Sequence, residues 1–523
     1  MNQRAREVLS VTGVLTVAGG IAVGAAMLPE QIGVRTVSST LPAVISAPTL
    51  ACTGPETLVV PDGGKAVSPG AGVLISALLA SGSNGEATVK AGGDLSETVR
   101  GLSKNLPVSD VPVHTGTELE LPVKAGERSL GGLSTWSLGP VVMSASDDTP
   151  QSPPELAAVQ STVTARGDLR GLSASRCDQP AAESWLVGGG TVAGERLRLV
   201  LSNPTSTASV VDVSVLSEDG RAEAPSGTGV VVPAGGQSPV FVDALAPGRQ
   251  SVAVHVVARS GRVLARMHDS VLRGLVAGGV DVVSPAADAS KHQLVPGISL
   301  VNGYSKTADD TTAPASTSIR VAVPGSEEAV VRLRLLGSTG AVAMPAAGVV
   351  NVPGGGVVDI PVHGVASGTY TAVIDSDVPV VAGARIGRPS APGHHATEFG
   401  WAPATKTLTG NGYTMLPPGT RSTLSLVAPG KAASLTITPY DAGGSRLDPI
   451  DVEMRAGTAA AFALDEKTAA FYVSAFEGGP VAASVVSTGS DDNGPVITVL
   501  GVEPPRADRA PSTAVSDARL GLR

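Results

Sequence analysis

The residues best suited to chemistry in this sequence lie close together in "GHHATEFGW", at 393–401. The stretch places His394 and His395 beside Glu398 and Trp401, and histidine and carboxylate side chains act as metal ligands and as general acids or bases. Either role needs partners from elsewhere in the fold, and the chain contains no Gly-x-Ser-x-Gly, His-Glu-x-x-His or Ser-x-x-Lys motif with partners. We interpret the stretch as a polar loop between modules, and we predict no catalytic and no metal-binding residues.

Paired carboxylates are the second kind of candidate, because glycosidases place an acid and a base about 5 to 9.5 Å apart. The adjacent pairs at 147–148, 309–310 and 491–492 all lie in stretches rich in Ser, Thr, Pro or Gly. With only 3 Trp, 5 Tyr and 5 Phe, the chain also offers few aromatic surfaces for a sugar. We interpret the pairs as solvated loops, so a glycan-active enzyme is the alternative function and not the preferred one.

A glycine-rich stretch, "VGGGTVAGE" at 187–195, resembles a dinucleotide-binding loop. Such a loop opens a helix, whereas "ERLRLVLSNP" follows here and alternates as a strand does. We therefore predict no cofactor, and expect Gly188 and Gly190 to turn the chain into its first long strand. A turn at Asn203 and Pro204 ends that strand, and we expect Trp185 to close the end of a β-sandwich.

The two cysteines lie in similar contexts, "ACTGPETL" at 51–58 and "RCDQPAAESW" at 176–185. Each precedes Pro and Glu at the head of a strand-like run, and an exported chain permits disulfides. We predict a bond between Cys52 and Cys177, which would close a loop of about 125 residues and contribute up to about 5 kcal/mol.

Composition indicates an all-β protein. The chain has 523 residues, 64 Gly and 40 Pro, with 42% hydrophobic but only 2% aromatic residues. This mixture is typical of short strands joined by tight turns, and the length suggests three to four domains. A net charge of -9 argues against a nucleic-acid partner, which requires a basic surface.

An internal repeat sets the expected architecture. Four similar stretches occur: "GPVVMSAS" at 139–146, "GRVLARMH" at 261–268, "VPVVAGAR" at 378–385 and "GPVAASVV" at 479–486. Units of this size, with about seven strands each, predict a row of immunoglobulin-like β-sandwich modules. In the second unit we expect strands near 185–187, 196–201, 208–216, 229–232, 237–242, 251–257 and 263–269.

The N-terminus predicts a membrane anchor. Arg4 and Arg6 precede an uncharged stretch from Val8 to Leu28, which is long enough to span a bilayer as a helix. The positive flank places the N-terminus in the cytoplasm and the bulk of the chain outside the cell. We favour an uncleaved single-pass anchor over a cleaved signal peptide.

The expected organisation follows from these signals. It comprises a cytoplasmic tip (1–7), a transmembrane helix (8–28), an extended stalk (29–50), β-modules at 51–175, 176–290, 291–392 and 393–488, and a mostly disordered tail (489–523).

The pattern "WLVGGGT…LRLVLSNP…VVVPAGG…GRVLA" resembles a repeat of exported actinobacterial proteins. With one N-terminal anchor and a Cys before "ESWLVGG", the whole chain resembles an actinobacterial family of membrane-anchored β-module proteins catalogued as a domain of unknown function. The resemblance implies a Gram-positive envelope setting and brings no catalytic residues. Later units depart from it, since Gly303 replaces the proline of the strand-ending turn.

Together these expectations favour a non-catalytic scaffold or binding protein of the bacterial cell envelope. Its partner would be an envelope protein, such as a membrane glycosyltransferase, or a cell-wall glycan. A glycan-active enzyme or accessory subunit, built across modules from residues such as His394, Glu398 and Trp401, is the alternative. A surface adhesin is a further alternative that the sequence does not separate from the scaffold.

Overall fold

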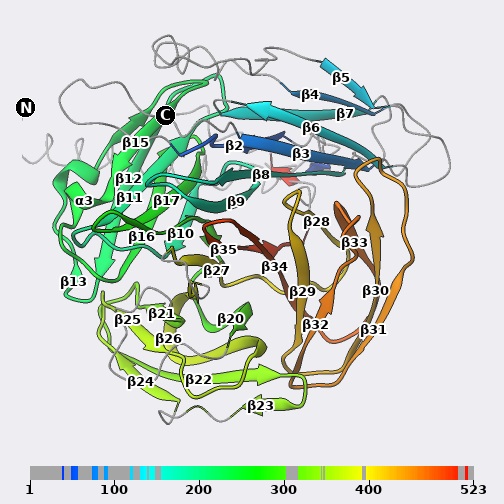
Figure 1. Ribbon diagram of the computed structural model, residues 1–523. Coiled ribbons are helices and arrows are strands. Elements are labelled where there is room, and N and C mark those ends of the chain that lie inside the picture. The colour runs from blue at the N-terminus through cyan, green and yellow to red at the C-terminus, as the bar shows by residue number, and fades with distance from the viewer. Residues whose placement is uncertain are drawn as a thin grey trace, which may run out of the picture. The chain divides into compact units, whose positions relative to one another are not determined.

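The computed structural model describes residues 38–40, 49–56, 73–80, 87–91, 118–121, 130–137, 140–147, 155–301, 316–342, 344, 348–390, 396–504 and 513–515 (Figure 1). The chain divides into two compact units, Met1–Ile45 with Ala507–Arg523, and Ser46–Arg506. In the first unit β1 (Ser38–Thr40) pairs antiparallel with β36 (Thr513–Val515). The strands β2 (Thr49–Cys52) to β35 (Gly494–Val502) belong to the second unit.

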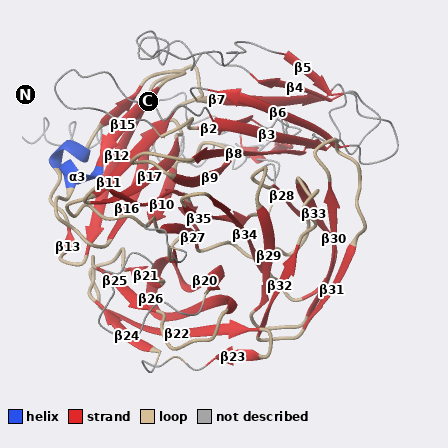
Figure 2. Ribbon diagram, viewed as in Figure 1, coloured by secondary structure: helices blue, strands red, loops and turns tan. Residues whose placement is uncertain are grey.

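The protein is all-β, which confirms the predicted class at that level (Figure 2). Among the described residues the one α-helix is the short α3 (Val242–Leu245). No helix in the described ranges is long and apolar enough to cross a membrane, and the predicted anchor at 8–28 lies outside those ranges.

The strands that the structure describes in this unit fall into four groups that follow one another along the chain. Within each group the strands pair in two sets, sheet I and sheet II. Group 1 contains β2 (Thr49–Cys52), β3 (Val73–Ala80), β4 (Ala87–Ala91), β5 (Glu118–Leu121), β6 (Leu130–Ser137), β7 (Val141–Asp147), β8 (Glu155–Thr164) and β9 (Gly171–Cys177). Group 2 contains β10 (Glu183–Val187), β11 (Glu195–Ser202), β12 (Ser209–Ser217), β13 (Gly220–Arg221), β14 (Val230–Val232), β15 (Gln237–Phe241), β16 (Val252–Ser260), β17 (Leu264–Arg273), β18 (Val276–Val283) and β19 (Pro285–Ala286).

Group 3 contains β20 (Ser290–Leu300), β21 (Ser318–Ala322), β22 (Ala329–Gly337), β23 (Gly340–Val342), β24 (Val349–Val352), β25 (Val357–Pro361), β26 (Gly368–Arg388) and β27 (Glu398–Pro403). Group 4 contains β28 (Gly412–Met415), β29 (Arg421–Ala428), β30 (Ala433–Tyr440), β31 (Ile450–Met454), β32 (Thr458–Ala463), β33 (Ala470–Gly478), β34 (Ala482–Asp491) and β35 (Gly494–Val502).

The same pairing order recurs in all four groups. If the main strands of a group are lettered A to H along the chain, sheet I has the order A-F-C-D and sheet II the order E-B-G-H. In group 4 these are β28-β33-β30-β31 and β32-β29-β34-β35, and in group 1 they are β2-β7-β4-β5 and β6-β3-β8-β9. In group 3 the 21-residue β26 serves as both F and G, because its first half pairs with β22 and its second half with β21.

In groups 2, 3 and 4 the two sheets enclose one core each, built from the alternation that the sequence shows. In group 2 that core takes every second residue of β11, β12 and β16: Leu197, Leu199, Leu201, Val211, Val213, Val215, Val252, Val254 and Val256. Each of these side chains is at most 4% exposed. Alternate residues of a strand point to opposite faces, so the period of two places one whole set in the core.

Strand H differs from the expectation in two groups. The sequence predicts seven strands in the second unit but gives no prediction for β18. The seven lie near the observed β10, β11, β12, β14, β15, β16 and β17. The sequence analysis also assigns 489–523 to a mostly disordered tail, whereas β35 occupies Gly494–Val502 and buries Ile497 and Val502 completely. The two glycines of "VAGGVDVV" conceal β18, whereas the apolar run from Val496 to Val502 is visible in the sequence within the segment assigned to the tail.

The repeat motif is also shifted in one unit. The stretches at 261–268, 378–385 and 479–486 run into the G strands β17, β26 and β34, but "GPVVMSAS" at 139–146 lies at β7, the F strand of group 1. The G strand there is β8, which begins at Glu155. A proline-containing turn before a valine-rich strand therefore occurs at two different positions of the repeat.

The four H strands, β9, β18, β27 and β35, contact one another in a closed cycle, and we call them the hub strands. Figure 1 labels three of them, β9, β27 and β35. The strand β9 contacts β18, β18 contacts β27, β27 contacts β35, and β35 contacts β9. Group 4 thus returns to group 1, and the groups form a ring and not the expected row.

Candidate functional site

The stretch "GHHATEFGW" contains four candidate residues for chemistry. His394 and His395 lie outside the described residues, whereas Glu398 and Trp401 lie on the hub strand β27. Both are buried, with 0% of Glu398 and 2% of Trp401 exposed. Their surroundings therefore decide whether this region performs chemistry or holds the fold together.

Glu398 binds the main chain of two neighbouring hub strands. Its Oε1 accepts two hydrogen bonds, from the Val280 N–H of β18 at 2.8 Å and from the N–H of the next residue, Phe399, at 3.1 Å. Its Oε2 accepts the Leu172 N–H of β9 at 3.3 Å. Burial raises the pKa of Glu398 well above its ordinary value, and the two hydrogen bonds to Oε1 act in the opposite direction.

Asp281 makes the corresponding connections from β18. Its Oδ2 accepts the Trp401 N–H of β27 at 2.7 Å, and its Oδ1 accepts the Thr498 hydroxyl of β35 at 3.0 Å. The same hydroxyl lies 3.5 Å from the Ala174 carbonyl oxygen of β9. Burial raises the pKa of Asp281 well above its ordinary value, so this carboxyl also favours its neutral form.

Glycine allows this close approach. Gly279 has a φ of +124°, and a Cβ there would lie 2.6 Å from Glu398 Oε1. Gly171 is equally constrained, because a Cβ there would lie 2.7 Å from Val280 Cγ1. Only glycine adopts such a backbone conformation without strain while leaving room for the carboxylate.

Two arginines of group 1 show that β9 and β35 run in the same direction. Near the beginning of both strands, Arg170 donates to the Gly494 and Pro495 carbonyl oxygens at 2.6 and 2.8 Å and to Asp491 at 2.7 Å. Near their ends, Arg176 donates to the Gly501 carbonyl oxygen at 3.0 Å. In the described residues, these contacts and those of Glu398 and Asp281 join the hub strands through side chains, since no ladder pairs one hub strand with another.

Trp401 belongs to a second buried cluster, at the junction of groups 2 and 3. Its indole N–H donates to Asp269 Oδ2 at 2.8 Å, and the guanidinium of Arg320 lies 4.9 Å from its ring centre. Arg320 forms a bidentate pair with Asp359, at 2.7 and 2.8 Å, and also donates to the Gly189 carbonyl oxygen. An arginine of group 3 thus binds the glycine loop of group 2.

Asp269 is a buried carboxyl whose pKa lies near neutral pH. Burial raises its pKa to about 7, with a further contribution from the nearby Glu195 carboxylate, while the Trp401 hydrogen bond lowers it. Such a pKa suits a general acid or base. However, Asp269 and Trp401 are each 2% exposed, so a substrate does not reach them in this arrangement.

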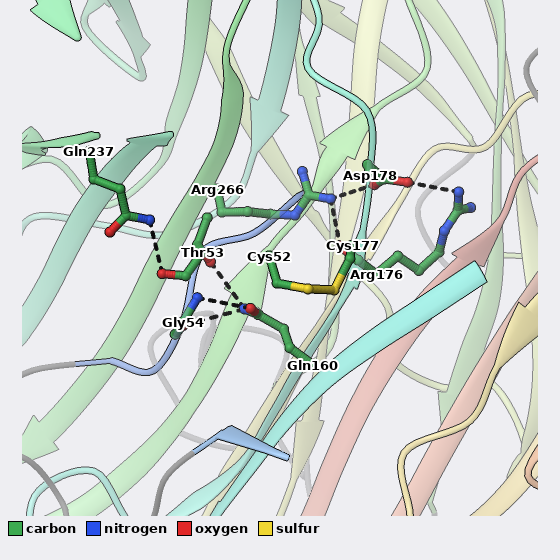
Figure 3. Close-up of a disulfide and its surroundings, with 9 residues drawn as sticks. All are labelled: Cys52, Thr53, Gly54, Gln160, Arg176, Cys177, Asp178, Gln237 and Arg266. Atoms are coloured by element: carbon green, nitrogen blue, oxygen red, sulfur yellow. Dashed lines mark hydrogen bonds and ion pairs between the residues drawn. A yellow bond between two sulfur atoms is a disulfide. The ribbon is translucent and has the colours of Figure 1, made fainter. Parts of the chain in front are cut away.

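The structure contains the disulfide between Cys52 and Cys177, with a Cα–Cα distance of 4.6 Å (Figure 3). Its surroundings are polar, because Arg176 and Arg266 both bind Asp178, the next residue along the chain. Cys52 is 0% and Cys177 3% exposed. The bond joins the first strand of group 1 to its hub strand.

Trp185 occupies a different place from the one expected. It stacks on His255, with ring centres 3.9 Å apart, and belongs to an apolar cluster that includes Val357 and Val381 of group 3. It therefore covers the outer face of sheet I of group 2, and its side chain takes no part in that group's own core cluster. The sequence analysis did not foresee a group that would cover this face.

The predicted turns lie where the spacing places them. Gly188 and Gly190 lie between β10 and β11, and Asn203 and Pro204 follow β11 directly. Asn203 is fully buried, donates to the carbonyl oxygens of Thr207 and Val232 at 2.7 and 3.2 Å, and accepts from Thr205.

Sequence reasoning missed Asp281, Asp269 and Thr498. A signal was present, since each is a polar residue among alternating valines or other apolar residues. Within the described ranges, no three His, Cys, Asp or Glu side chains are placed to hold a metal ion.

The comparisons give a family without an assigned activity. A model described as "Family of unknown function (DUF5719)" matches residues 137–465. The chain belongs to the DUF5719 family. The matched region includes the hub strands β9, β18 and β27 and ends before β35. No curated protein matches the sequence.

Proposed function

We propose that this DUF5719 protein is a non-catalytic scaffold or binding protein of the bacterial cell envelope. In this proposal the segment 8–28 anchors the chain in the membrane of an actinobacterium, with the N-terminus in the cytoplasm. The strand groups lie outside the cell and present their surfaces to an envelope protein such as a membrane glycosyltransferase.

The observation that carries the proposal is that the buried carboxyls of the hub strands, Glu398 and Asp281, are hydrogen-bonded to neighbouring hub strands. All oxygens of Glu398 and Asp281 accept hydrogen bonds from hub strands. Catalytic carboxyls need access to a substrate, whereas these connect strand groups. The alternative of a glycan-active enzyme built on Glu398 and Trp401 loses support because both side chains are buried.

We further infer that each strand group is a β-sandwich related to the immunoglobulin-like architecture but with its own strand order. Immunoglobulin domains place strands A, B, E and D in one sheet and C, F and G in the other. Here the order is A-F-C-D and E-B-G-H. The additional strand H is the one that connects the groups.

The test is site-specific photo-crosslinking in intact cells. A photoreactive residue is placed, one position at a time, at exposed apolar sites: Val163 (50% exposed), Val231 (58%), Leu275 (99%) and Val349 (53%). The fully buried Phe471 serves as the control position. The proposal expects capture of one specific envelope protein from at least one of the exposed positions and none from Phe471. Recovery from every exposed position at the level of the Phe471 control would contradict it.

A further inference from the structure

Among the side chains that the structure describes, apolar clusters close three of the four junctions in the ring, and these three junctions share one geometry. At each, sheet I of one group packs on sheet II of the next. The clusters are Trp185, Leu216 and Ala253 with Ala322, Val357 and Val381; Leu336 and Val373 with Val427, Ala459 and Ala482; and Met415 and Ala470 with Ala157, Val159 and Ala174.

The fourth junction, between groups 1 and 2, contains a buried arginine. Leu264, opposite Ser202, stands in group 2 where Val381 lies opposite Ala322 in group 3 and Ala482 lies opposite Val427 in group 4. Arg266, opposite Val200, follows two residues further along β17 and lies on the same face of the strand. Arg266 is 1% exposed and binds the Asp178 carboxylate and the Arg176 carbonyl oxygen of the chain that leaves group 1.

The segment Cys52–Glu56 lies in this junction and binds both groups (Figure 3). On the group 1 side, the Gly54 N–H donates to Gln160 Oε1 at 3.0 Å, and Gln160 Nε2 donates to Thr53 Oγ1 at 3.0 Å. On the group 2 side, Gln237 of β15 donates to the Thr53 carbonyl oxygen at 3.0 Å. The segment is held at one end by the disulfide to Cys177.

Glu56 holds the other end. Its Oε2 accepts Arg198 Nη2 of β11 at 2.9 Å and lies 2.8 Å from His268 Nδ1 of β17, and its side chain is 11% exposed. Burial by itself would raise the pKa of Glu56, but the charges of His268 and Arg198 and their hydrogen bonds outweigh it and lower the pKa. The carboxylate is therefore ionised at neutral pH and binds two side chains of group 2, Arg198 and His268.

We propose that Cys52–Glu56 is a clasp that closes the ring between groups 1 and 2, and that this junction opens when the clasp is released while the three apolar junctions stay closed. The clasp works because one short segment is fixed covalently to group 1 and ionically to group 2. Apolar clusters bury area that remains buried when one ion pair is lost, whereas removal of one partner from a buried pair leaves donors desolvated without compensation. This inference concerns the chain alone and does not depend on the proposed function.

The clasp has a matched control within the chain. Asp375 accepts from Arg334 Nη2 at 2.9 Å and lies 2.7 Å from His292 Nδ1, so it has the same two kinds of partner as Glu56. All three residues of that cluster lie within group 3, however, and Arg334 and His292 are 53% and 81% exposed. An exposed pair of this kind contributes little to stability.

The experiment is hydrogen exchange followed by mass spectrometry on the full chain, for wild type, Glu56→Gln, Cys52→Ser/Cys177→Ser, the triple variant and Asp375→Asn. In Glu56→Gln we expect exchange in peptides covering Thr53–Glu56 and β15 to rise by at least about tenfold, as loss of a buried charged contact implies. Peptides of β26, β27, β34 and β35 should change by less than about twofold, and Asp375→Asn should leave the clasp peptides unchanged. If the serine variant does not fold, reduced wild-type protein replaces it.

The double-mutant comparison separates a clasp from two unrelated contacts. Because the disulfide and Glu56 hold the same segment, Glu56→Gln should add less than about twofold in the serine background. Three results would overturn the proposal: independent additive effects, equal rises in all four groups, or no change in Glu56→Gln.

Discussion

Replacement of Trp401 by alanine tests whether a hub strand supports the group beside it. Trp401 lies on β27 of group 3, yet it and Phe399 complete the core cluster of group 2. The change removes a side chain that is 2% exposed together with its hydrogen bond to Asp269. Truncation of a buried aromatic residue costs about 3–5 kcal/mol, and the loss of a partner for a buried carboxyl adds about 1–3 kcal/mol.

The assay is native-state hydrogen exchange with peptide resolution. We expect Trp401→Ala to reduce protection in β11 and β17, which contain Leu197 and Asp269, by at least as much as in β27 itself. The energy is lost from group 2 because that is where the indole packs. A global loss of about 4 kcal/mol corresponds to roughly a thousandfold faster exchange.

Phe471→Ala provides the control. Phe471 is 0% exposed and belongs to the core of group 4, so it is a similar truncation within one group. Its effect on exchange should be greatest in β30 and β33. If Trp401→Ala instead leaves β11 and β17 unchanged while β27 loses protection, the interlocking of groups through the hub is refuted.

The pH dependence, the disulfide and a buried turn give three further tests. Asp269→Asn should flatten the pH dependence of stability. Burial raises the pKa of Asp269 from 3.8 to about 7 in the folded protein. Its contribution to the free energy of unfolding, at most about 4 kcal/mol, is therefore fully present below pH 3.8 and is lost as the pH rises to about 7. Urea titrations at pH 5 and 8 measure this, and an equal pH dependence in both proteins would exclude the assignment. Cys52→Ser/Cys177→Ser should lower the free energy of unfolding by up to about 5 kcal/mol, since the bond closes a separation of 125 residues; a urea midpoint that does not move would contradict it. Asn203→Ala should cost about 1–3 kcal/mol because the Val232 carbonyl oxygen loses its donor in a buried hydrogen bond and the Thr207 carbonyl oxygen in a partly buried one, whereas a surface turn would tolerate the change within about 0.5 kcal/mol in thermal unfolding.

Local signals predicted seven strands of group 2, because alternation depends on neighbours along the chain. The β11 run of Leu197, Leu199 and Leu201 reads as a half-buried strand from its sequence, and it is one. The similar contexts of Cys52 and Cys177 likewise pointed to the observed disulfide. Both signals are local.

The hub could not be read in the same way, because its contacts join residues far apart in sequence. Asp281 binds Thr498, 217 residues away, and Glu398 binds Leu172, 226 residues away. Their partners are backbone N–H groups or a hydroxyl, which leave no compositional trace. The strand β18, with two glycines, has low strand propensity and is fixed by tertiary packing.

Burial of charged residues at junctions was also beyond the sequence. Arg198 alternates with leucines on β11 and is expected in solvent on that pattern, yet its side chain is 11% exposed and binds Glu56. The same holds for Arg266 and Arg320, at 1% and 3% exposed. Alternation predicts on which face of the strand a residue lies. Whether another group covers that face depends on how the groups pack in the ring.

The central claim is that the four hub strands form one cooperative unit. Native-state hydrogen exchange in increasing denaturant tests it most directly, through the amides of the four hub strands, including the Leu172 and Val280 N–H groups that bind Glu398. The account predicts that β9, β18, β27 and β35 exchange through one opening with a single free energy. Four separate openings, each shared only with the strands of its own group, would contradict it.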